Sequence, residues 1–454
     1  MLLSEAARSP SILDPAIPRN ATAPPVLASI ATHATALAKE PSPDAAALHV
    51  AKLLEAVSSL PPHTSLPAVR RIIVAALALR SFRHPPLSAA AEALAVQLLQ
   101  GLYVAHVMSA RHKGIVEFIH VSKSGGTSLC KLAQRNGCAS DRTLFHSNCL
   151  APAFDDGPRY LHLSYHASLR PQGAHSDCDQ LERGMTKRRT EASCDRRRRA
   201  LVKAGRPIYA NEYTALGGAQ DPSRAHHCVN MVTLLQVRHP HTRVLSHIRH
   251  VWARYSAACG QDRAVYLAAA DGAEHWVRLM PAPTNNYLIR TLLGEAVYHL
   301  PPGAVTRDHL GLARVLLAQQ VDVLTVLEDA QLSSHALRYG LGWRHVEERA
   351  NTAAPSTGDL QPRSGLELLW ELNALDVELY GFAAVLAAVD AVVYDVAGGV
   401  AGRLVDGPDA GPGWAAGAAG VGAQARTGDR SAGQHDLRMC GLAFGQAGGR
   451  RRRG

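Results

Sequence analysis

The sequence predicts an α/β fold in which helices flank a parallel sheet, with a helical N-terminal prefix and a disordered C-terminal tail rich in Gly and Ala. Short continuous apolar runs alternate with helical stretches, which is typical of buried parallel strands joined by helices. Two of these runs lead into polar loops that open a helix. In open α/β sheets the ligand site lies at the carboxyl ends of the strands, so these loops are the first place to look for function.

A leader and a helical prefix precede the sheet. Residues 1–43 are rich in Pro, Ala and Ser and are expected to form a loose leader. In residues 44–110 apolar side chains recur with a helical period, and the Pro pairs at 61–62 and 85–86 separate the runs, which predicts a helical prefix. Its three helices are expected at roughly 44–59, 66–82 and 87–110.

Continuous apolar runs mark the strands of the main domain, residues 111–397. They lie at 114–121, 231–237 and 321–327. A shorter strand-like run precedes Glu212. Each run is of strand length and ends in a turn signal, which favours strands over core helices.

The last segment, residues 398–454, differs in composition from the rest of the chain. It holds 16 of the 37 glycines and ends in four arginines. Such a segment buries too little apolar area to offset the entropy of ordering, so it is predicted to be disordered and dispensable for the chemistry.

Charge and hydropathy narrow the class of protein. The 454 residues carry a net charge of +10, which suggests an anionic partner without choosing among phosphate, nucleic acid, acidic glycan or membrane. The longest unbroken apolar run, Ile72–Leu79, has eight residues, too few to span a bilayer. The N-terminus lacks the basic flank and apolar core of a signal peptide. We therefore see no membrane anchor in the sequence, and the question of whether the protein has one stays open.

Cysteines and arginines cluster in the middle of the chain. Seven of the eight cysteines lie between Cys130 and Cys259, without a CxxC pair. This spacing argues against a zinc ribbon and favours some disulfides in an oxidising lumen, with the pairing left open. The basic runs Lys187–Arg189 and Arg196–Arg199 are either a solvated loop or a surface for an acidic polymer.

The loop after the first predicted strand has the composition of a P-loop-like anion site. Its glycine pair permits a sharp turn that exposes consecutive backbone N–H groups, and the following helix presents its positive dipole end. It is not a Walker A loop, because its lysine precedes the glycines instead of following them. The candidate binding residues are Lys123, Ser124, Gly125, Gly126, Thr127 and Ser128.

A second loop follows the strand at 231–237. Arg238 stands at the strand end, where its planar guanidinium suits a phosphate, and Ser246 follows on the next helix. Two anion sites, each after a buried strand, call for a ligand with two separated anionic ends.

These loops resemble those of the Golgi carbohydrate sulfotransferases, which include the heparan sulfate 2-O- and 6-O-sulfotransferases. Residues 121–128 resemble the family's (I/V)PKxGGTS loop, with Ser122 in place of Pro. The resemblance leads us to expect an intact loop, because Pro supplies rigidity there and not a contact. Further similarity lies in the RxPxxRxxS pattern at Arg238, Pro240, Arg243 and Ser246, in Asn286–Gly294, in Val323–Asp329 and in Asn373–Phe382.

The resemblance covers about residues 114–390, so it implies a sulfotransferase-like domain. It implies 3′-phosphoadenosine-5′-phosphosulfate (PAPS) as sulfo donor, with Lys123 to Ser128 at the 5′-phosphosulfate and Arg238 and Ser246 at the 3′-phosphate. It implies a carbohydrate acceptor, either a glycan or a polysaccharide, no metal and no nucleic acid. It also implies location in the Golgi lumen or membrane.

Sulfo transfer to a hydroxyl needs a base, and the family uses a His or a Glu in different branches. His162 and His166 lie where the branch that uses His carries its base, and Glu212 follows a strand-like run. The three candidates remain open, and Lys123 is expected to stabilise charge on the leaving phosphate.

Two other functions remain open. A P-loop nucleotide kinase or NTPase would need a Walker A lysine, which is absent, and an Asp after a strand, for which Asp329 is a weak candidate. A non-catalytic protein of the same fold would use its basic patches to hold acidic glycans.

Overall fold

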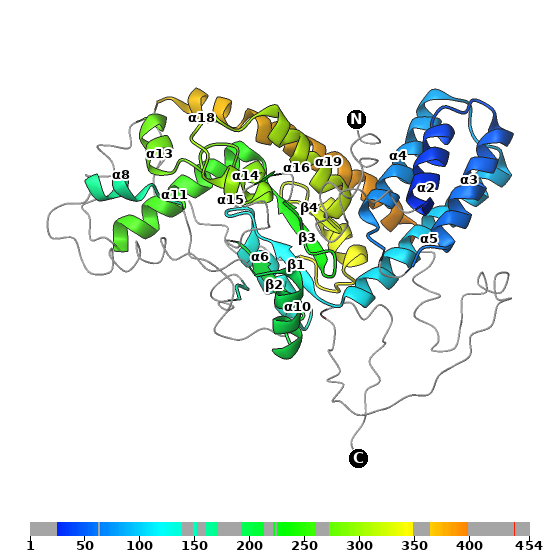
Figure 1. The fold of residues 1–454 in the computed structure, drawn as a ribbon, viewed down its shortest axis with the longest axis horizontal. Coiled ribbons are helices and arrows are strands. Elements are labelled where there is room, and N and C mark those ends of the chain that lie inside the picture. The colour runs from blue at the N-terminus through cyan, green and yellow to red at the C-terminus, as the bar shows by residue number, and fades with distance from the viewer. Residues whose placement is uncertain are drawn as a thin grey trace, which may run out of the picture.

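A four-stranded parallel sheet lies at the centre of the molecule, with the strand order β2-β1-β3-β4 (Figure 1). The strands are β1 Val116–Ile119, β2 Ile208–Asn211, β3 Val232–Val237 and β4 Val323–Val326, and all of their residues are buried. Burial on both faces explains why the strands are predominantly apolar and do not alternate between apolar and polar residues. The predicted α/β class with a parallel, helix-flanked sheet is confirmed.

This computed structural model describes most of the chain, with gaps. The described residues are 25–61, 64–138, 149–151, 160–169, 192–212, 221–222, 225–258, 272–347, 364–397 and Cys440. The basic run Lys187–Arg189 lies outside them, and so does the predicted tail apart from Cys440.

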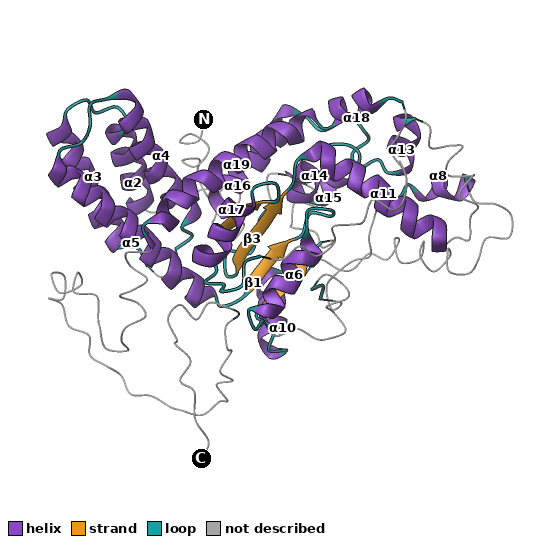
Figure 2. Ribbon diagram, turned by 180° about the vertical axis from the view of Figure 1, so that it is seen from behind, coloured by secondary structure: helices purple, strands orange, loops and turns teal. Residues whose placement is uncertain are grey.

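Helices pack on both sides of the sheet (Figure 2). Helices α17 and α19 lie beside β4, whereas α6 contacts β2 at the opposite edge. The helices of the main domain are α6 Gly126–Arg135, α8 Leu163–Ser168, α10 Cys194–Lys203, α11 Pro240–Ala258, α13 Ala273–Leu279, α14 Tyr287–Leu293, α15 Glu295–Tyr298, α16 Arg307–Gln320, α17 Ala330–His335, the π-helix η3 Ala336–Gly340, α18 Leu366–Leu372 and α19 Ala374–Asp395.

Helices also precede the sheet. They include α3 Pro43–Ser58, α4 Pro67–Arg83 and α5 Ala89–Lys113. The expected loose leader is shorter than the sequence indicates, because residues 25–37 form a fourth helix, α2 Pro25–Leu37. Its buried side chains Ile30, Ala34 and Leu37 recur at helical spacing and join the core formed with α3 and α4.

Buried charges tie the prefix to the last helix of the domain. Arg71 Nη2 lies 2.7 Å from Asp390 Oδ2, and Arg70 Nε donates to Asp390 Oδ1 at 2.8 Å. Burial alone raises the pKa of Asp390, but Arg70 and Arg71 overcome this and hold the pKa below its ordinary value. Arg71 also donates to the carbonyls of Leu317 and Val321 at the end of α16. The prefix is therefore joined to the domain through a satisfied polar cluster, since every charge in it has a partner.

Two helices, α5 and α19, are long and apolar enough to cross a membrane by length and composition. In the structure α5 packs on α3, and α19 packs on α4, α16 and β4. Each also places a charged side chain in a buried ion pair: Lys113 of α5 lies 2.8 Å from Asp322, and Asp390 of α19 binds the two arginines. These are the surroundings of helices in a protein core.

Three disulfides among the described residues confirm the expectation that some cysteines are paired. They join Cys130 to Cys149, Cys138 to Cys440 and Cys194 to Cys228. Cys178 and Cys259 lie outside the described residues. Two of the three bonds hold α6, because Cys130 lies in this helix and Cys138 follows just after it. The second of them fixes one point of the C-terminal segment against the domain, where Cys440 is buried.

Candidate functional site

The loop between β1 and α6 has the sharp turn that its sequence predicts. Lys123 and Gly125 have positive φ angles of 69° and 85°. A Cβ atom at Gly125 would collide with the amide of Gln236, which donates to the carbonyl of Ser124. A Cβ atom at Gly126 would collide with the imidazole of His120. The glycine pair therefore lets β3 and His120 approach the loop backbone.

Arg238 connects the second loop to the first. Its Nη1 donates to the carbonyl of Lys123 at 2.9 Å, and its Nε donates to Thr242 Oγ1 at 3.2 Å. Its third nitrogen, Nη2, has no hydrogen-bond partner within the described part of the chain. Ser246, which is partly buried, lies one helical turn beyond Thr242 on the same face of α11. Arg238 and Ser246 therefore line one face beside the loop.

Arg243, the second arginine of this pattern, has another role. Its side chain is 1% exposed, donates to the carbonyl of Pro283 and lies 4.7 Å from the centre of the Tyr287 ring. Burial lowers its pKa to about 10, so it remains charged at neutral pH. It supports the position of α11 instead of facing a ligand.

Glu212 lies at the same edge of the sheet as the loop. Strands β1 and β2 run parallel with Ile119 opposite Asn211, so the residues that follow the two strands meet. Glu212 Oε1 accepts hydrogen bonds from Ser122 Oγ at 2.5 Å and from Tyr160 OH at 3.2 Å. Its Oε2 lies 3.2 Å from His120 Nδ1. The Glu212 carboxylate is therefore hydrogen-bonded to the loop through Ser122.

Opposing effects act on the pKa of Lys123. Burial lowers the pKa of Lys123 below its ordinary value and Arg238 lowers it further, while Glu212 raises it. Burial likewise lowers the pKa of Arg238, and Glu328 opposes that shift. Glu328 accepts a hydrogen bond from the backbone of His239 at 2.9 Å. A cation and a carboxylate therefore face each other at the ends of β1 and β2, and a second pair lies at the ends of β3 and β4.

The two candidate histidines belong to another part of the domain. His162 is exposed and caps the start of α8, where its Nδ1 accepts from the backbone N–H of Tyr165 at 3.3 Å. His166 is buried in the same helix. Both views place α8 at the far end of α11, away from α6 and the loop (Figures 1 and 2). Of the three candidate bases, the structure brings Glu212 to the loop.

A cavity of about 1340 Å³ opens beside α6. Its walls include Ser128 and Leu129 of α6, Gln236 of β3 and Leu327 after β4. It reaches the loop from the side opposite Glu212, because β3 and β4 lie on one side of β1 and β2 lies on the other.

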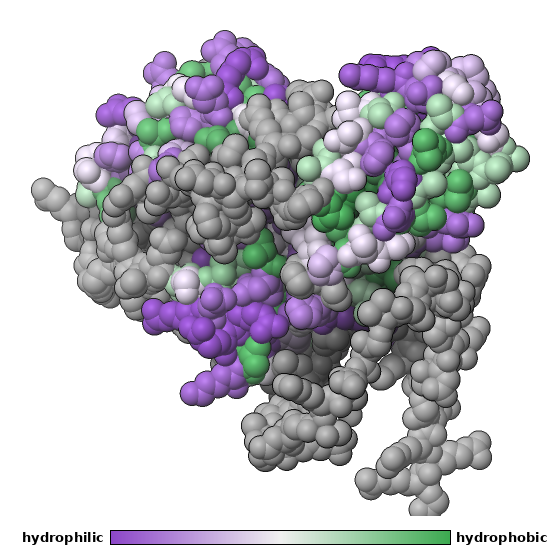
Figure 3. Space-filling model, turned by 45° about the vertical axis from the view of Figure 1, so that its right-hand side comes forward, coloured by the Kyte–Doolittle hydropathy of each residue, from purple (hydrophilic) through white to green (hydrophobic). Residues whose placement is uncertain are grey.

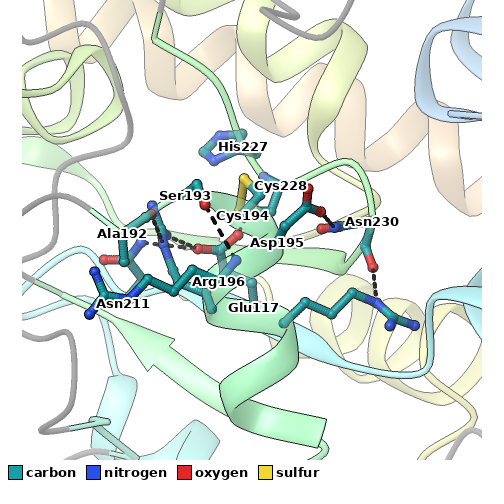
Figure 4. The surroundings of a disulfide bond; sticks show 12 residues. Glu117, Ala192, Ser193, Cys194, Asp195, Arg196, Asn211, His227, Cys228 and Asn230 are labelled. Atoms are coloured by element: carbon teal, nitrogen blue, oxygen red, sulfur yellow. Dashed lines mark hydrogen bonds and ion pairs between the residues drawn. A yellow bond between two sulfur atoms is a disulfide. The ribbon is translucent and has the colours of Figure 1, made fainter.

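The basic run Arg196–Arg199 on α10 is only partly a solvated surface. Arg197 is 3% exposed and donates to Glu117 Oε1 at 2.9 Å, and Arg198 donates to the carbonyl of Asn230 at 3.2 Å. Figure 4 shows Glu117 and Asn230 in the surroundings of the Cys194–Cys228 disulfide. The remaining two arginines are exposed. Figure 3 shows a contiguous hydrophilic region on the lower part of the described surface.

Sequence reasoning missed His120 and Tyr160 as members of the site. His120 directly precedes the loop, so its position was a usable signal. Tyr160 comes from a separate segment, and nothing in its sequence context points to Glu212.

Comparison with known proteins adds no assignment: no protein-family model, no curated protein and no solved structure matches the chain.

Proposed function

We propose that the chain is a sulfotransferase that moves a sulfo group from PAPS to a hydroxyl of a carbohydrate. The observation that supports this best is the meeting of Lys123, Glu212 and Arg238 at the ends of three adjacent parallel strands. A cation at an anion loop beside a carboxylate is the pair that transfer from an anionic donor to a hydroxyl needs.

The residues present fit a donor with two anionic ends. Ser124 Oγ is buried and lacks a hydrogen-bond partner among the described residues, and the N-terminus of α6 favours negative charge. These groups, with Lys123, would hold the 5′-phosphosulfate, while Arg238 and Ser246 would hold the 3′-phosphate. The cavity beside α6 has room for the nucleoside. When bound, PAPS supplies an activated sulfo group.

Two side chains would carry the chemistry. Lys123, whose charge is already partly desolvated, would stabilise negative charge on the leaving phosphate oxygen. Glu212 would accept the proton of the acceptor hydroxyl, and its place beside the loop supports it over His162 and His166 in this role. The three disulfides are in keeping with an oxidising compartment such as the Golgi lumen.

The alternatives have less support. Asp329 Oδ1 accepts from the backbone N–H of Leu332 at 2.8 Å and caps α17, which is a structural role and not that of a magnesium ligand in a kinase. A non-catalytic glycan-binding protein would have no need of a carboxylate held against the anion loop.

The test is transfer of radiolabelled sulfate from PAPS to a panel of desulfated glycans, with binding of 3′-phosphoadenosine-5′-phosphate measured by calorimetry. Transfer to at least one glycan supports the proposal. Failure to bind the nucleotide by folded, oxidised protein overturns it. Nucleotide binding without transfer to any member of the panel supports the non-catalytic alternative instead.

A further inference from the structure

Resting on the proposed role of Glu212 as base, we infer that Ser122 and Tyr160 are positioning residues whose hydroxyls hold Glu212 in one rotamer and in its ionised form. Ser122 is the residue at which the loop departs from the pattern that it resembles, since that pattern has Pro there. Pro has no hydroxyl, so this contact with Glu212 is a property of this chain.

Three oxygens form a closed triangle at Glu212. Ser122 Oγ lies 2.5 Å from Glu212 Oε1 and 2.7 Å from Tyr160 OH, and Tyr160 OH lies 3.2 Å from the same Oε1. Ser122 is 1% exposed, Tyr160 3% and Glu212 8%, so bulk water does not replace these contacts. Each hydroxyl has one proton, and an ionised carboxylate only accepts. Two protons serve these contacts when Ser122 donates to Glu212 Oε1 and Tyr160 donates either to the same Oε1 or to Ser122 Oγ.

Burial and hydrogen bonding act on Glu212 in opposite directions. Burial disfavours the charged form of a carboxyl group, while hydrogen bonds donated to the carboxylate favour it. His120, with Nδ1 3.2 Å from Oε2, and the ammonium of Lys123 add positive or donor groups on the other side. The two hydroxyls therefore help to keep a buried base ionised, which it must be in order to accept a proton.

Other titratable groups interact with this carboxylate or with Tyr160. Among the described residues, His120, Lys123 and Tyr287 interact with the carboxylate, and His247 and His250 of α11 pack against the Tyr160 ring. Burial, Arg243 and other nearby cations lower the pKa of His247 well below its ordinary value, so it stays neutral near pH 7. Burial raises the pKa of Tyr287, and Arg243 stays charged.

The first experiment measures the carboxyl group directly. Full-length protein is labelled with ¹³Cδ-glutamate, and the Glu212 resonance is identified by its loss in Glu212→Gln. Removing one hydroxyl donor in Ser122→Ala should raise the titration midpoint of that resonance by about one pH unit. Ser122→Pro should do the same, and Ser122→Thr, which keeps the hydroxyl, should restore the wild-type midpoint.

A matched control separates this effect from general loosening of the fold. Ser109→Ala removes another buried serine hydroxyl, one that donates to the carbonyl of Thr64 in the prefix, and should leave the Glu212 midpoint unchanged. An unchanged midpoint in folded Ser122→Ala and Ser122→Pro overturns the inference. A midpoint that also moves in Ser109→Ala overturns it as well.

Tyr160→Phe provides an independent route if the serine variants fail to fold. It should raise the same midpoint, whereas Tyr209→Phe should not. Tyr209 is a fitting control because its hydroxyl donates to another buried carboxylate, Glu117, in the same sheet. An unmoved midpoint in folded Tyr160→Phe contradicts the role of that hydroxyl.

The second experiment follows the pH dependence of sulfo transfer. The acidic limb of the kcat/KM profile should shift upward in Ser122→Ala by the same amount as the resonance, with KM for PAPS little changed. Failure of the proposed function and failure of this inference are distinguishable. If the wild-type protein transfers no sulfate, the proposed function is wrong, and the Glu212 resonance still tests the inference. Transfer with an unshifted acidic limb and resonance removes only the inference.

Discussion

Arg238 Nη1 donates a hydrogen bond to the backbone carbonyl of Lys123 at 2.9 Å. The contact joins the loop after β3 to the loop after β1 across 115 residues of sequence. Arg238, which is proposed to bind the 3′-phosphate, therefore also binds the backbone of Lys123, which is proposed to act at the leaving phosphate. Substituting Arg238 should consequently affect both sites, whereas substituting Lys123 should affect the leaving phosphate alone.

Lys123→Ala should lower kcat for sulfo transfer by roughly 10²-fold or more, because removing one group that stabilises developing charge typically has such an effect. Lys123 is only partly buried, so the melting temperature should change little. Lys131→Ala, an exposed lysine on α6, serves as the control. Wild-type turnover by folded Lys123→Ala would remove Lys123 from the mechanism.

Arg238→Ala should weaken binding of 3′-phosphoadenosine-5′-phosphate more than it lowers kcat. Losing a hydrogen bond to a charged group costs about 1.5–3 kcal/mol, which is roughly a ten- to hundred-fold change in affinity. Calorimetry measures the affinity, and Arg199→Ala on α10 provides an exposed arginine as control. Unchanged affinity would show that the second loop does not bind phosphate. Because Arg238 also holds the Lys123 carbonyl, we expect some loss of kcat at saturating donor.

Asp390→Ala should destabilise the fold by roughly 3–5 kcal/mol, since it leaves Arg70 and Arg71 buried without their carboxylate. Urea denaturation measures the change. Glu55→Ala removes an exposed ion pair with Lys52, whose side chains are 72% and 50% exposed, and should change stability by less than about 1 kcal/mol. Similar losses in the two variants would mean that the prefix is not joined to the domain through Asp390.

Stability should fall on acidification between about pH 6.5 and pH 4. Burial first, and Arg70 second, lower the pKa of His106 to about 4, and burial lowers that of His227 to about 4. The unfolded chain then binds more protons than the folded chain in this window, so stability is complete above pH 6.5 and is lost as the pH falls.

For His106 alone the shift corresponds to roughly 3 kcal/mol at its limit. Urea denaturation of the wild type and of His106→Gln, at a series of pH values, should show a shallower pH dependence in the variant. His299→Gln, in an exposed pair with Glu295, should retain the wild-type slope. Equal slopes in His106→Gln and wild type would contradict the assignment.

Truncation after Ala397 should now have an effect on stability, although the sequence alone predicts a dispensable tail. It removes Cys440, the partner of Cys138, and losing a native disulfide typically costs roughly 2–5 kcal/mol. Cys440→Ser in the full chain is the matched variant. Equal melting temperatures for the truncated protein and for Cys440→Ser would show that the Cys138–Cys440 bond accounts for the whole effect. A truncated protein as stable as the wild type would show that this bond does not contribute to stability. Transfer should survive in both below their melting temperatures.

Local patterns in the sequence predict the sheet and the loop well. β1, β3 and β4 are short, predominantly apolar segments, Gly125 has a positive φ angle, and the Gly125–Gly126 pair makes the close contacts that its composition implies. These features depend on neighbours in the chain, so their signal is present in a short window.

Contacts between distant segments explain what the sequence could not predict. Arg71 directly precedes the apolar run Ile72–Leu79, and nothing near it in the sequence indicates that Asp390, 319 residues later, is its partner. Ser122 looks like a neutral substitute for Pro until Glu212 and Tyr160 meet it. Arg197 appears to belong to a solvated run, but Glu117 is buried beneath it. In each case the partner is chosen by the fold, and no local spacing encodes it.

The ion pairs between α4 and α19 also have a consequence for how the chain is made. Arg71 leaves the ribosome 319 residues before Asp390, which at roughly 5–20 residues per second is a delay of roughly 15–60 s. During this time the prefix holds two arginines without the carboxylate that neutralises them in the finished protein. The N-terminal helices therefore complete their packing only when the last helix emerges.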